Sequence, residues 1–351
     1  MSTPRPYTLI AELTYKCALH CPYCSNPARR TQETLPAEIW ERTLDDASAL
    51  GVVQLHLSGG EPLLYRDLER LIARGHQLGL YVNLITSGVP LTRARLIALH
   101  AAGLDHIQLS IQDATRQSSD SIAGARVFDR KCQVASWVHD TGLAFTLNVV
   151  LHRANIDRVP EIVALAEQLG AHRLELANTQ YLGVAFANRA WLLPTRTQIE
   201  EAYEAAQRAR ERLFGRMEII FVKPDYFGST PRACMDGWAR NYIHVTPAGR
   251  VLPCHAAEAI PELVFDSVRD RGLAEIWASS PALQRFRGES WMKEPCRSCE
   301  RRSIDFGGCR CQAYLLAGDP TVADPACALS PAHGQIESVH NERTYVLRAR
   351  R

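Results

Sequence analysis

The chain has 351 residues, of which 46% are apolar and 22% charged, and its formal net charge is +2. That length and apolar content allow a large core, arranged as one large domain plus a smaller one. No basic block indicates nucleic-acid binding, and no apolar run reaches the roughly 18 residues that span a membrane. No apolar signal segment opens the chain, so we expect a cytoplasmic protein whose eleven cysteines are metal ligands rather than disulfides.

Strand-like and helix-like patterns alternate from residue 7 to about residue 215. Apolar runs bounded by turn residues predict strands, and apolar residues three and four positions apart predict helices. Strands are predicted at 7–14, 52–58, 80–86, 106–112, 144–151, 172–178 and 217–223, and helices at 36–50, 66–78, 91–102, 126–141, 156–169 and 195–213. Alternating units of this kind build a parallel sheet covered by helices, so we predict an α/β fold.

The number of units and a change in composition predict the domain organisation. Six strand–helix units are too few for a closed eight-stranded barrel, and the glycine pattern of a dinucleotide-binding domain is missing. Residues 224–330 contain many prolines and glycines and seven of the cysteines. We therefore predict a first domain at 1–223, a second at 224–330 with a metal core, and a polar, mobile tail at 331–351.

Cys17, Cys21 and Cys24 lie in one short loop directly after the first predicted strand. Three thiolates this close can bind three irons of a four-iron cluster and leave the fourth iron open. A zinc knuckle is the alternative, but zinc sites usually have paired hooks and four ligands, and no fourth cysteine lies nearby. The C-x3-C-x2-C spacing, with Tyr23 before the last cysteine, resembles the radical S-adenosylmethionine (SAM) enzymes. The resemblance implies an open (β/α)6 partial barrel and a catalytic [4Fe–4S] cluster that binds SAM.

Gly59, Gly60, Glu61 and Pro62 follow the second predicted strand. Two adjacent glycines let the backbone approach a ligand, and backbone groups there can bind a charged small molecule. A Gly-Gly turn alone is weak evidence for a ligand site, because such a turn usually marks only the end of a strand. At this distance from the cysteine loop it resembles the GGEP element of radical SAM enzymes, which implies contact with the amino group of SAM.

Polar residues on later strands are further candidates for cofactor and substrate contacts. Ser110 and Gln112 share one face of a predicted strand, and Asn148 lies on the next. By position they resemble the family's ribose and carboxylate contacts. At the end of the sixth predicted strand, the residues that either face a substrate or cap the strand are Glu175, Asn178, Gln180 and Tyr181.

Seven cysteines lie in the second predicted domain, which also contains a hairpin-like segment at 245–252. They are Cys234, Cys254, Cys296, Cys299, Cys309, Cys311 and Cys327. Their spacing resembles the SPASM domain, which implies two auxiliary iron–sulfur clusters, although zinc remains open on spacing alone. One cysteine position of that pattern is occupied by Asp305. The remaining cysteine, Cys132, lies in a predicted helix and is expected to be a core residue.

The number of available ligands supports Asp305 as a metal ligand. Two four-ligand clusters need eight groups, and seven cysteines plus Asp305 supply eight. The alternative is that Asp305 is an ordinary loop residue and one cluster has an open iron. The resemblance implies a first auxiliary set and a second auxiliary set, each a [4Fe–4S] cluster or one of them a [2Fe–2S] cluster. The first set is Cys234, Cys254, Cys309 and Cys311, and the second is Cys296, Cys299, Asp305 and Cys327.

The whole pattern resembles the PqqA peptide cyclases, the radical SAM enzymes of pyrroloquinoline quinone (PQQ) biosynthesis. The most specific segments are 174–181, 231–238 and 251–257. The resemblance implies that a glutamate side chain of the PqqA peptide loses a γ-hydrogen and attacks a tyrosine ring, and that the auxiliary clusters accept the released electron. The alternatives are another SPASM peptide maturase, acting by thioether formation or sulfatase-type oxidation, and a non-catalytic metal scaffold.

The resemblance also implies partners. Only sixteen residues precede Cys17, too few for a leader-binding domain, so we expect the separate peptide chaperone PqqD to present PqqA. An electron donor such as flavodoxin is implied for the SAM cluster. No nucleic acid or membrane partner is expected.

Overall fold

A single sheet organises the molecule. The structure is a computed structural model that describes residues 3–27 and 33–336. Within these residues the sheet has nine strands in the order β7-β6-β5-β4-β3-β2-β1-β8-β9. Neighbouring strands are parallel, except that β8 and β9 are antiparallel. The strands are β1 Thr8–Thr14, β2 Gln54–Gly59, β3 Tyr81–Thr86, β4 His106–Ser110, β5 Ala144–Leu151, β6 Arg173–Asn178, β7 Glu218–Phe221, β8 Tyr242–Val245 and β9 Val251–Leu252.

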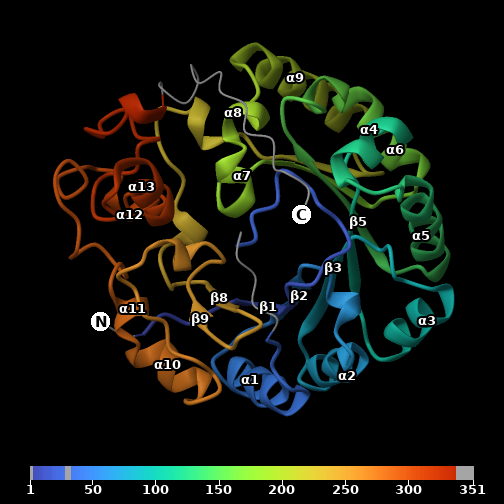
Figure 1. Ribbon diagram of the computed structural model, residues 1–351, viewed down its shortest axis with the longest axis horizontal. Coiled ribbons are helices and arrows are strands. Elements are labelled where there is room, and N and C mark those ends of the chain that lie inside the picture. Colours follow the sequence, from blue (N-terminus) through green and yellow to red (C-terminus); the bar gives the residue numbers. More distant parts are fainter. Residues whose placement is uncertain (1–2, 28–32, 337–351) are drawn as a thin grey trace.

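Helices cover the outside of this sheet. Figure 1 shows α1 to α6 and α9 around β1 to β5, and α10 to α13 on the side of β8 and β9. The α-helices are α1 Ala37–Ala49, α2 Leu68–Gln77, α3 Arg93–Ala101, α4 Arg116–Ala123, α5 Phe128–Thr141, α6 Val159–Gln168, α7 Gly183–Ala187, α8 Arg189–Leu192, α9 Arg196–Arg212, α10 Leu273–Ser279, α11 Pro281–Gln284, α12 Arg302–Asp305 and α13 Arg310–Ala317. Short 3-10 helices are η1 Pro62–Leu64, η2 Ile156–Arg158, η3 Asp225–Phe227, η4 Cys234–Asp236 and η5 Ala257–Ala259. No helix in the described part of the chain is long and apolar enough to cross a membrane.

The sequence predicted this architecture closely. Every predicted strand and helix is present, with ends that differ by at most three residues. The sheet is open, since among the described residues its edge strands β7 and β9 do not pair with each other. The fold is therefore an open α/β partial barrel, as expected. The short helices α4, α7, α8 and α10 to α13 were not predicted, because they lie in segments too short for a clear helical period.

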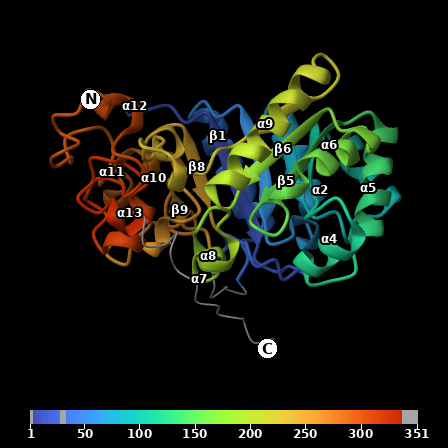
Figure 2. The ribbon, with the colours of Figure 1, turned by 90° about the horizontal axis from the view of Figure 1, so that it is seen from above.

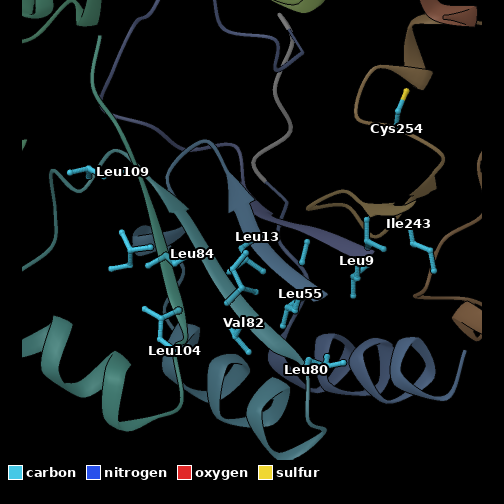
Figure 3. Close-up of a cluster of buried hydrophobic side chains, with 14 of the residues drawn as sticks. Leu9, Leu13, Leu55, Leu80, Val82, Leu84, Leu104, Leu109, Ile243 and Cys254 are labelled. Carbon is cyan, nitrogen blue, oxygen red and sulfur yellow. The ribbon is translucent and has the colours of Figure 1, made fainter. Parts of the chain in front are cut away.

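Alternation along the strands separates the two faces of the sheet. On β1, Leu9 and Leu13 are fully buried, and Leu55 and Val82 on β2 and β3 join them in one core. Figure 3 shows these side chains between the strands and the helices below them. Since successive residues of a strand point to opposite faces, the residues between them face the inner side of the barrel. Each leucine buried this way contributes about 1.5–3 kcal/mol.

The second cysteine region continues the sheet of the first. Strand β8 pairs in parallel with β1, with Ile10 opposite His244, and β9 then closes a hairpin on β8. The hairpin predicted at 245–252 is thus present, and it starts earlier, at Tyr242. Figure 2 shows α10, α11 and α13 beyond β8 and β9, at the end opposite α4 to α6. The composition change at residue 223 therefore does not coincide with a break in the sheet.

Two further expectations concern single segments. Cys132 lies on a helix, α5, but it is only half-buried, because the buried stripe of that helix runs through Lys131, Val134 and Val138 instead. In the segment 331–351, Ile336 is 3% exposed and packs with Tyr181. Residues 337–351 of the predicted tail lie outside the described residues.

Candidate active site

The N-terminal cysteine loop begins where β1 ends. The Leu19 amide donates to the Cys17 sulfur at 3.4 Å, and the Cys24 amide donates to the Cys21 carbonyl at 3.2 Å. The amide of Ala185 on α7 donates to the Cys24 carbonyl at 3.1 Å, which ties the loop to the far side of the barrel. Burial, together with the neighbouring Cys24 and Cys17, raises the pKa of Cys21 to about 11. The three predicted thiol ligands therefore lie together.

Gly59 and Gly60 allow the end of β2 to lie close to the start of this loop. Gly59 has φ +133°, and a Cβ there would collide with the carbonyl oxygen of Thr14. A Cβ on Gly60 would meet the carbonyls of Tyr15 and Lys16, and the Gly60 amide donates to Thr14 O at 2.6 Å. The pair is thus required by close backbone packing against the start of the cysteine loop. The sequence located this turn correctly, the close packing of the backbone is an additional reason for the glycines, and their contact with a ligand stays a prediction.

Glu61 holds the ends of β2 and β3 together. Its carboxylate is 2% exposed and accepts from the Leu63 amide at 3.2 Å, the Thr86 hydroxyl at 2.5 Å and the Ser87 amide at 2.9 Å. The Ser87 hydroxyl also donates to it. Pro62 is buried and begins η1. Because protein donors occupy the Glu61 carboxylate, its side chain positions the turn rather than presenting a free charge.

A buried lysine that we did not predict stands behind the cysteine loop. Lys131 on α5 is 0% exposed, and its ammonium donates to Ser110 O at 2.7 Å and to Gln112 Oε1 at 2.8 Å. Gln112 in turn donates from Nε2 to the Tyr23 hydroxyl at 3.1 Å. Burial lowers the pKa of Lys131 to about 8, while Cys21, Glu61 and Cys17 act in the opposite direction. Its place in the apolar stripe of α5 was the signal that could have revealed it.

The other predicted contact residues fall into two groups: some lie on the inner face of the sheet, and others pack against neighbouring side chains. Ser110 and Asn148 are register partners on β4 and β5 and point to the inner side. Glu175 is half-buried and Gln180 exposed. Asn178 and Tyr181 are buried, and the Tyr181 ring lies 4.9 Å from the ring of Tyr226. Tyr181 therefore packs locally.

The first auxiliary set forms a ring of four sulfurs. Cys234 contacts the thiols of Cys254 and Cys309. Cys311 contacts those of Cys309 and Cys254, with the Cys254 and Cys311 sulfurs 3.8 Å apart. The contact with Cys234, together with burial, raises the pKa of Cys309 to about 12. The structure thus brings together the four residues assigned to one cluster. They include Cys311, whose assignment was based only on the number of ligands needed.

The second auxiliary set also gathers, at a more exposed place. Burial raises the pKa of Cys296 to about 11, with smaller contributions from Cys327, Asp305 and Cys299. Asp305 ends α12 and is 8% exposed, and its Oδ1 accepts from the Gly307 amide at 3.0 Å. Its Oδ2 lies 3.3 Å from Arg301 Nε. Asp305 thus lies beside the thiols while keeping two protein donors.

Arg310, another residue we did not single out, lies between the two auxiliary sets. It is 1% exposed and donates to the backbone carbonyls of Pro320 at 3.0 Å and Val322 at 2.6 Å. Its positive charge acts to lower the pKa of both Cys234 and Cys296, one from each set. A buried cation is costly unless negative groups compensate it, so this arrangement suits anionic thiolate clusters.

The donor chemistry of these sites fits iron–sulfur clusters. All but one of the eleven predicted ligands are thiols, the soft donors that such clusters use. Among residues 3–27 and 33–336, no three His, Cys, Asp or Glu side chains are arranged to hold a single metal ion.

Comparisons with known proteins agree with this architecture. Residues 11–166 match the model of the Radical SAM superfamily, and residues 234–300 match that of the SPASM iron–sulfur cluster-binding domain. SuiB of Streptococcus suis bound to S-adenosylmethionine has a similar fold, with a TM-score of 0.77 at 19% identity over 92% of this chain and 77% of that one. A structure of anSMEcpe with bound AdoMet and a Cp18Cys peptide gives a TM-score of 0.65 at 14% identity, covering 96% of both chains. The fold and its two cysteine regions thus define a radical SAM enzyme with a SPASM domain.

Closer relatives identify the family. The chain is 52% identical over 340 residues to the PqqA peptide cyclase of Methylobacterium sp. (strain 4-46), covering 96% of this chain and 89% of the relative. It is 51% identical over 343 residues to that of Methylorubrum extorquens (strain PA1), covering 97% and 89%. The chain belongs to the PqqA peptide cyclase family.

Proposed function

We propose that this enzyme joins the γ-carbon of a glutamate to a ring carbon of a tyrosine within the PqqA peptide. The observation that carries the proposal is the match to PqqA peptide cyclases over 96% of the chain. The gathering of three thiols beside the Gly59–Gly60 turn supports it, since an incomplete ligand set leaves a cluster an open iron. The reaction removes two hydrogens from the peptide and adds no atom.

We propose three iron–sulfur clusters per chain. Cys17, Cys21 and Cys24 would hold the SAM-binding [4Fe–4S] cluster in the domain 1–223, and the two auxiliary sets would hold the others in the domain 224–330. When bound, these groups supply one-electron chemistry: reductive cleavage of SAM to a 5′-deoxyadenosyl radical at the first, and acceptance of the released electron at the others. Reconstituted protein should contain about twelve irons if all clusters are [4Fe–4S], and about ten if one is [2Fe–2S]. A stable value near four irons would contradict the auxiliary assignment.

The chain's own residues would bind and orient SAM. The turn at Gly59 and Gly60 would contact its amino group, as the family pattern implies. Ser110 and Asn148 lie on the inner face, where they can reach the ribose or the carboxylate. Lys131 would balance the negative charge of the thiolates and of the SAM carboxylate, since its buried ammonium lies next to Cys21 and Cys17. Gln112 and Tyr23 would position that ammonium and the loop.

The proposed partners follow from the family. PqqA would be the substrate, PqqD its chaperone and a flavodoxin-type protein the electron donor, all in the cytoplasm. Ordering a free peptide costs about 1–2 kcal/mol per fixed residue. A chaperone that holds the leader raises the effective concentration of the peptide and offsets part of that cost.

The decisive experiment is mass spectrometry of PqqA after incubation with the enzyme, PqqD, SAM and a reductant. We expect a loss of two hydrogens and no peptide fragmentation between the linked residues. A different mass change would instead favour another SPASM maturase. Equal turnover without PqqD would contradict the proposed need for a chaperone. An electron spin resonance signal that does not change when SAM is added would favour a non-catalytic metal scaffold.

A further inference from the structure

A buried acid–base pair lies on the inner face of the barrel and has no part in the function described so far. Glu12 on β1 is 5% exposed and His244 on β8 is 2% exposed, and Glu12 Oε2 lies 3.1 Å from His244 Nε2. Leu9 and Leu13 of β1 pack toward the helices, so Glu12 points to the inner side. A buried carboxylate and imidazole are costly unless they are paired, and here they pair with each other.

The pair lies between the two regions that carry the chemistry. In the sheet, Glu12 is the register partner of Ser58, which directly precedes the Gly59 turn. On its other side, the His244 ring lies 6.0 Å from the ring of His255, the residue that follows Cys254 of the first auxiliary set. Glu12 and His244 therefore lie between the Gly59 turn and the first auxiliary set along the inner face of the sheet.

The polar atoms of the pair are incompletely used by the protein. Glu12 Oε2 and His244 Nε2 contact each other, whereas His244 Nδ1 and His255 Nε2 are buried with no hydrogen-bond partner among the described residues. Each unsatisfied buried group costs about 1–3 kcal/mol. Two such ring nitrogens beside one carboxylate indicate a place that can accept a proton or a polar substrate group.

The charges around the pair keep the carboxylate ready to accept a proton. Burial raises the pKa of Glu12, but His244 and His255 outweigh it, so the pKa lies below its usual value. Tyr15 hydrogen-bonds to the same carboxylate. From η5, Glu258 faces the pair and is itself paired with Arg250, Oε1 to Nε at 2.5 Å. Glu12 is therefore ionised at neutral pH.

We propose that Glu12, together with His244, accepts the proton that the substrate ring loses when the new bond is completed. This inference rests on the proposed function. Once the glutamate carbon has added to the ring, that ring carbon still carries its hydrogen. Its C–H bond breaks, the proton goes to the Glu12 carboxylate, and the electron pair returns to the ring. One unpaired electron then leaves to an iron–sulfur cluster as the electron acceptor, and the ring is aromatic again.

Two variants and a matched control test the pair. Glu12→Gln and His244→Gln should leave peptide binding, 5′-deoxyadenosine formation and transfer of deuterium from a labelled glutamate within about twofold of the wild type. The linked product should fall about a hundredfold, the usual size of a general-base effect. Glu12→Asp, which keeps a carboxylate, should recover part of the product. His106→Gln is the control, because His106 lies on the inner face of β4 with its Nε2 2.9 Å from Thr146 Oγ1.

A second measurement needs neither peptide nor SAM. The midpoint potential of the cluster-loaded protein should fall as pH rises, because reduction beside the pair takes up a proton, and this slope should flatten in Glu12→Gln. Unchanged product in both variants, equal loss in His106→Gln, or the same potential slope in Glu12→Gln would overturn the proposal. A wild-type product without the loss of two hydrogens would overturn the proposed function instead. The potential measurement would still test whether Glu12 and His244 take up a proton.

Discussion

The N-terminal cysteine loop and the first auxiliary set are built in opposite ways. Cys17, Cys21 and Cys24 are close in sequence, and the regular strands β1 and β2 hold their loop through backbone contacts at Gly59 and Gly60. The four thiols of the auxiliary set are spread from Cys234 to Cys311, come from separate segments that include the start of α13, and contact one another. Neighbouring strands thus hold the first set of thiols through one short loop, whereas the second set depends on contacts among segments far apart in the chain. Removing ligands from each region tests that difference.

The largest expected effect is at the N-terminal loop. Cys17→Ala, Cys21→Ala or Cys24→Ala should abolish SAM cleavage, because each thiolate would hold one iron of the only SAM-binding cluster. Chromatography of 5′-deoxyadenosine measures this. Cys132→Ala is the matched control, since that half-buried cysteine on α5 belongs to no predicted set, and it should keep full cleavage. Substantial cleavage in any loop variant would show that the loop is not the open site.

The auxiliary region should separate the two half-reactions. Cys296→Ala or Cys327→Ala should retain measurable SAM cleavage and stop formation of the linked peptide, because electron removal would lack its acceptor. Both products are quantified in one assay. Full linked product from either variant would refute the electron-accepting role.

Asp305 tests whether a carboxylate completes the second auxiliary set. Asp305→Ala should lose or perturb one cluster and most of the linked product, while Asp305→Cys should keep the cluster with a shifted potential, because a thiolate is a softer donor. Iron content and redox titration measure the two outcomes. Asp319→Ala, at a more exposed carboxylate, is the control. Full iron content in Asp305→Ala would mean that the residue serves only Gly307 and Arg301.

Lys131 should matter more for SAM binding than for iron loading. Lys131→Met removes the buried positive charge, which Ser110 O and Gln112 Oε1 hold in place. If that charge meets the SAM carboxylate, a charged hydrogen bond of about 1.5–3 kcal/mol is lost, and SAM affinity should fall about 10- to 100-fold. Lys131→Arg should retain part of it. The exposed Lys293→Met is the control. Unchanged affinity with lost iron would assign Lys131 to the loop alone.

The smallest effect concerns acid stability behind the cysteine loop. His152 is 0% exposed, its ring lies 5.6 Å from that of Tyr23, and burial lowers its pKa to about 4. As pH falls from about 6.5 to 4, the unfolded chain binds a proton that the folded chain does not, so folding stability is lost. His152→Gln should reduce that loss by up to about 1 kcal/mol per pH unit, measured by urea unfolding. His100→Gln, at an exposed site on α3, should leave it unchanged.

The sequence predicted what depends on local pattern. The strands, the helices and the cysteine loop follow from apolar periodicity and spacing, and the structure confirms the predicted elements. Lys131 was missed because a lysine in an apolar stripe looks like part of a helix until its acceptors are known. The pair of Glu12 and His244 was missed because it depends on β8 joining β1, a contact between residues far apart in the chain. Glu61 was located correctly, yet its role in holding β3 needed Thr86 and Ser87.

The pairing of β8 with β1 also bears on how the protein can be shortened. A chain cut at residue 223 would leave β1 as an open edge, with the backbone groups that now meet Tyr242 to Val245 unpaired. Open parallel edges recruit strands from other molecules, so such a fragment would tend to aggregate. It would also expose Leu9 and Ala11, which are now fully buried. The radical domain is thus separable in sequence but not as a stable fragment.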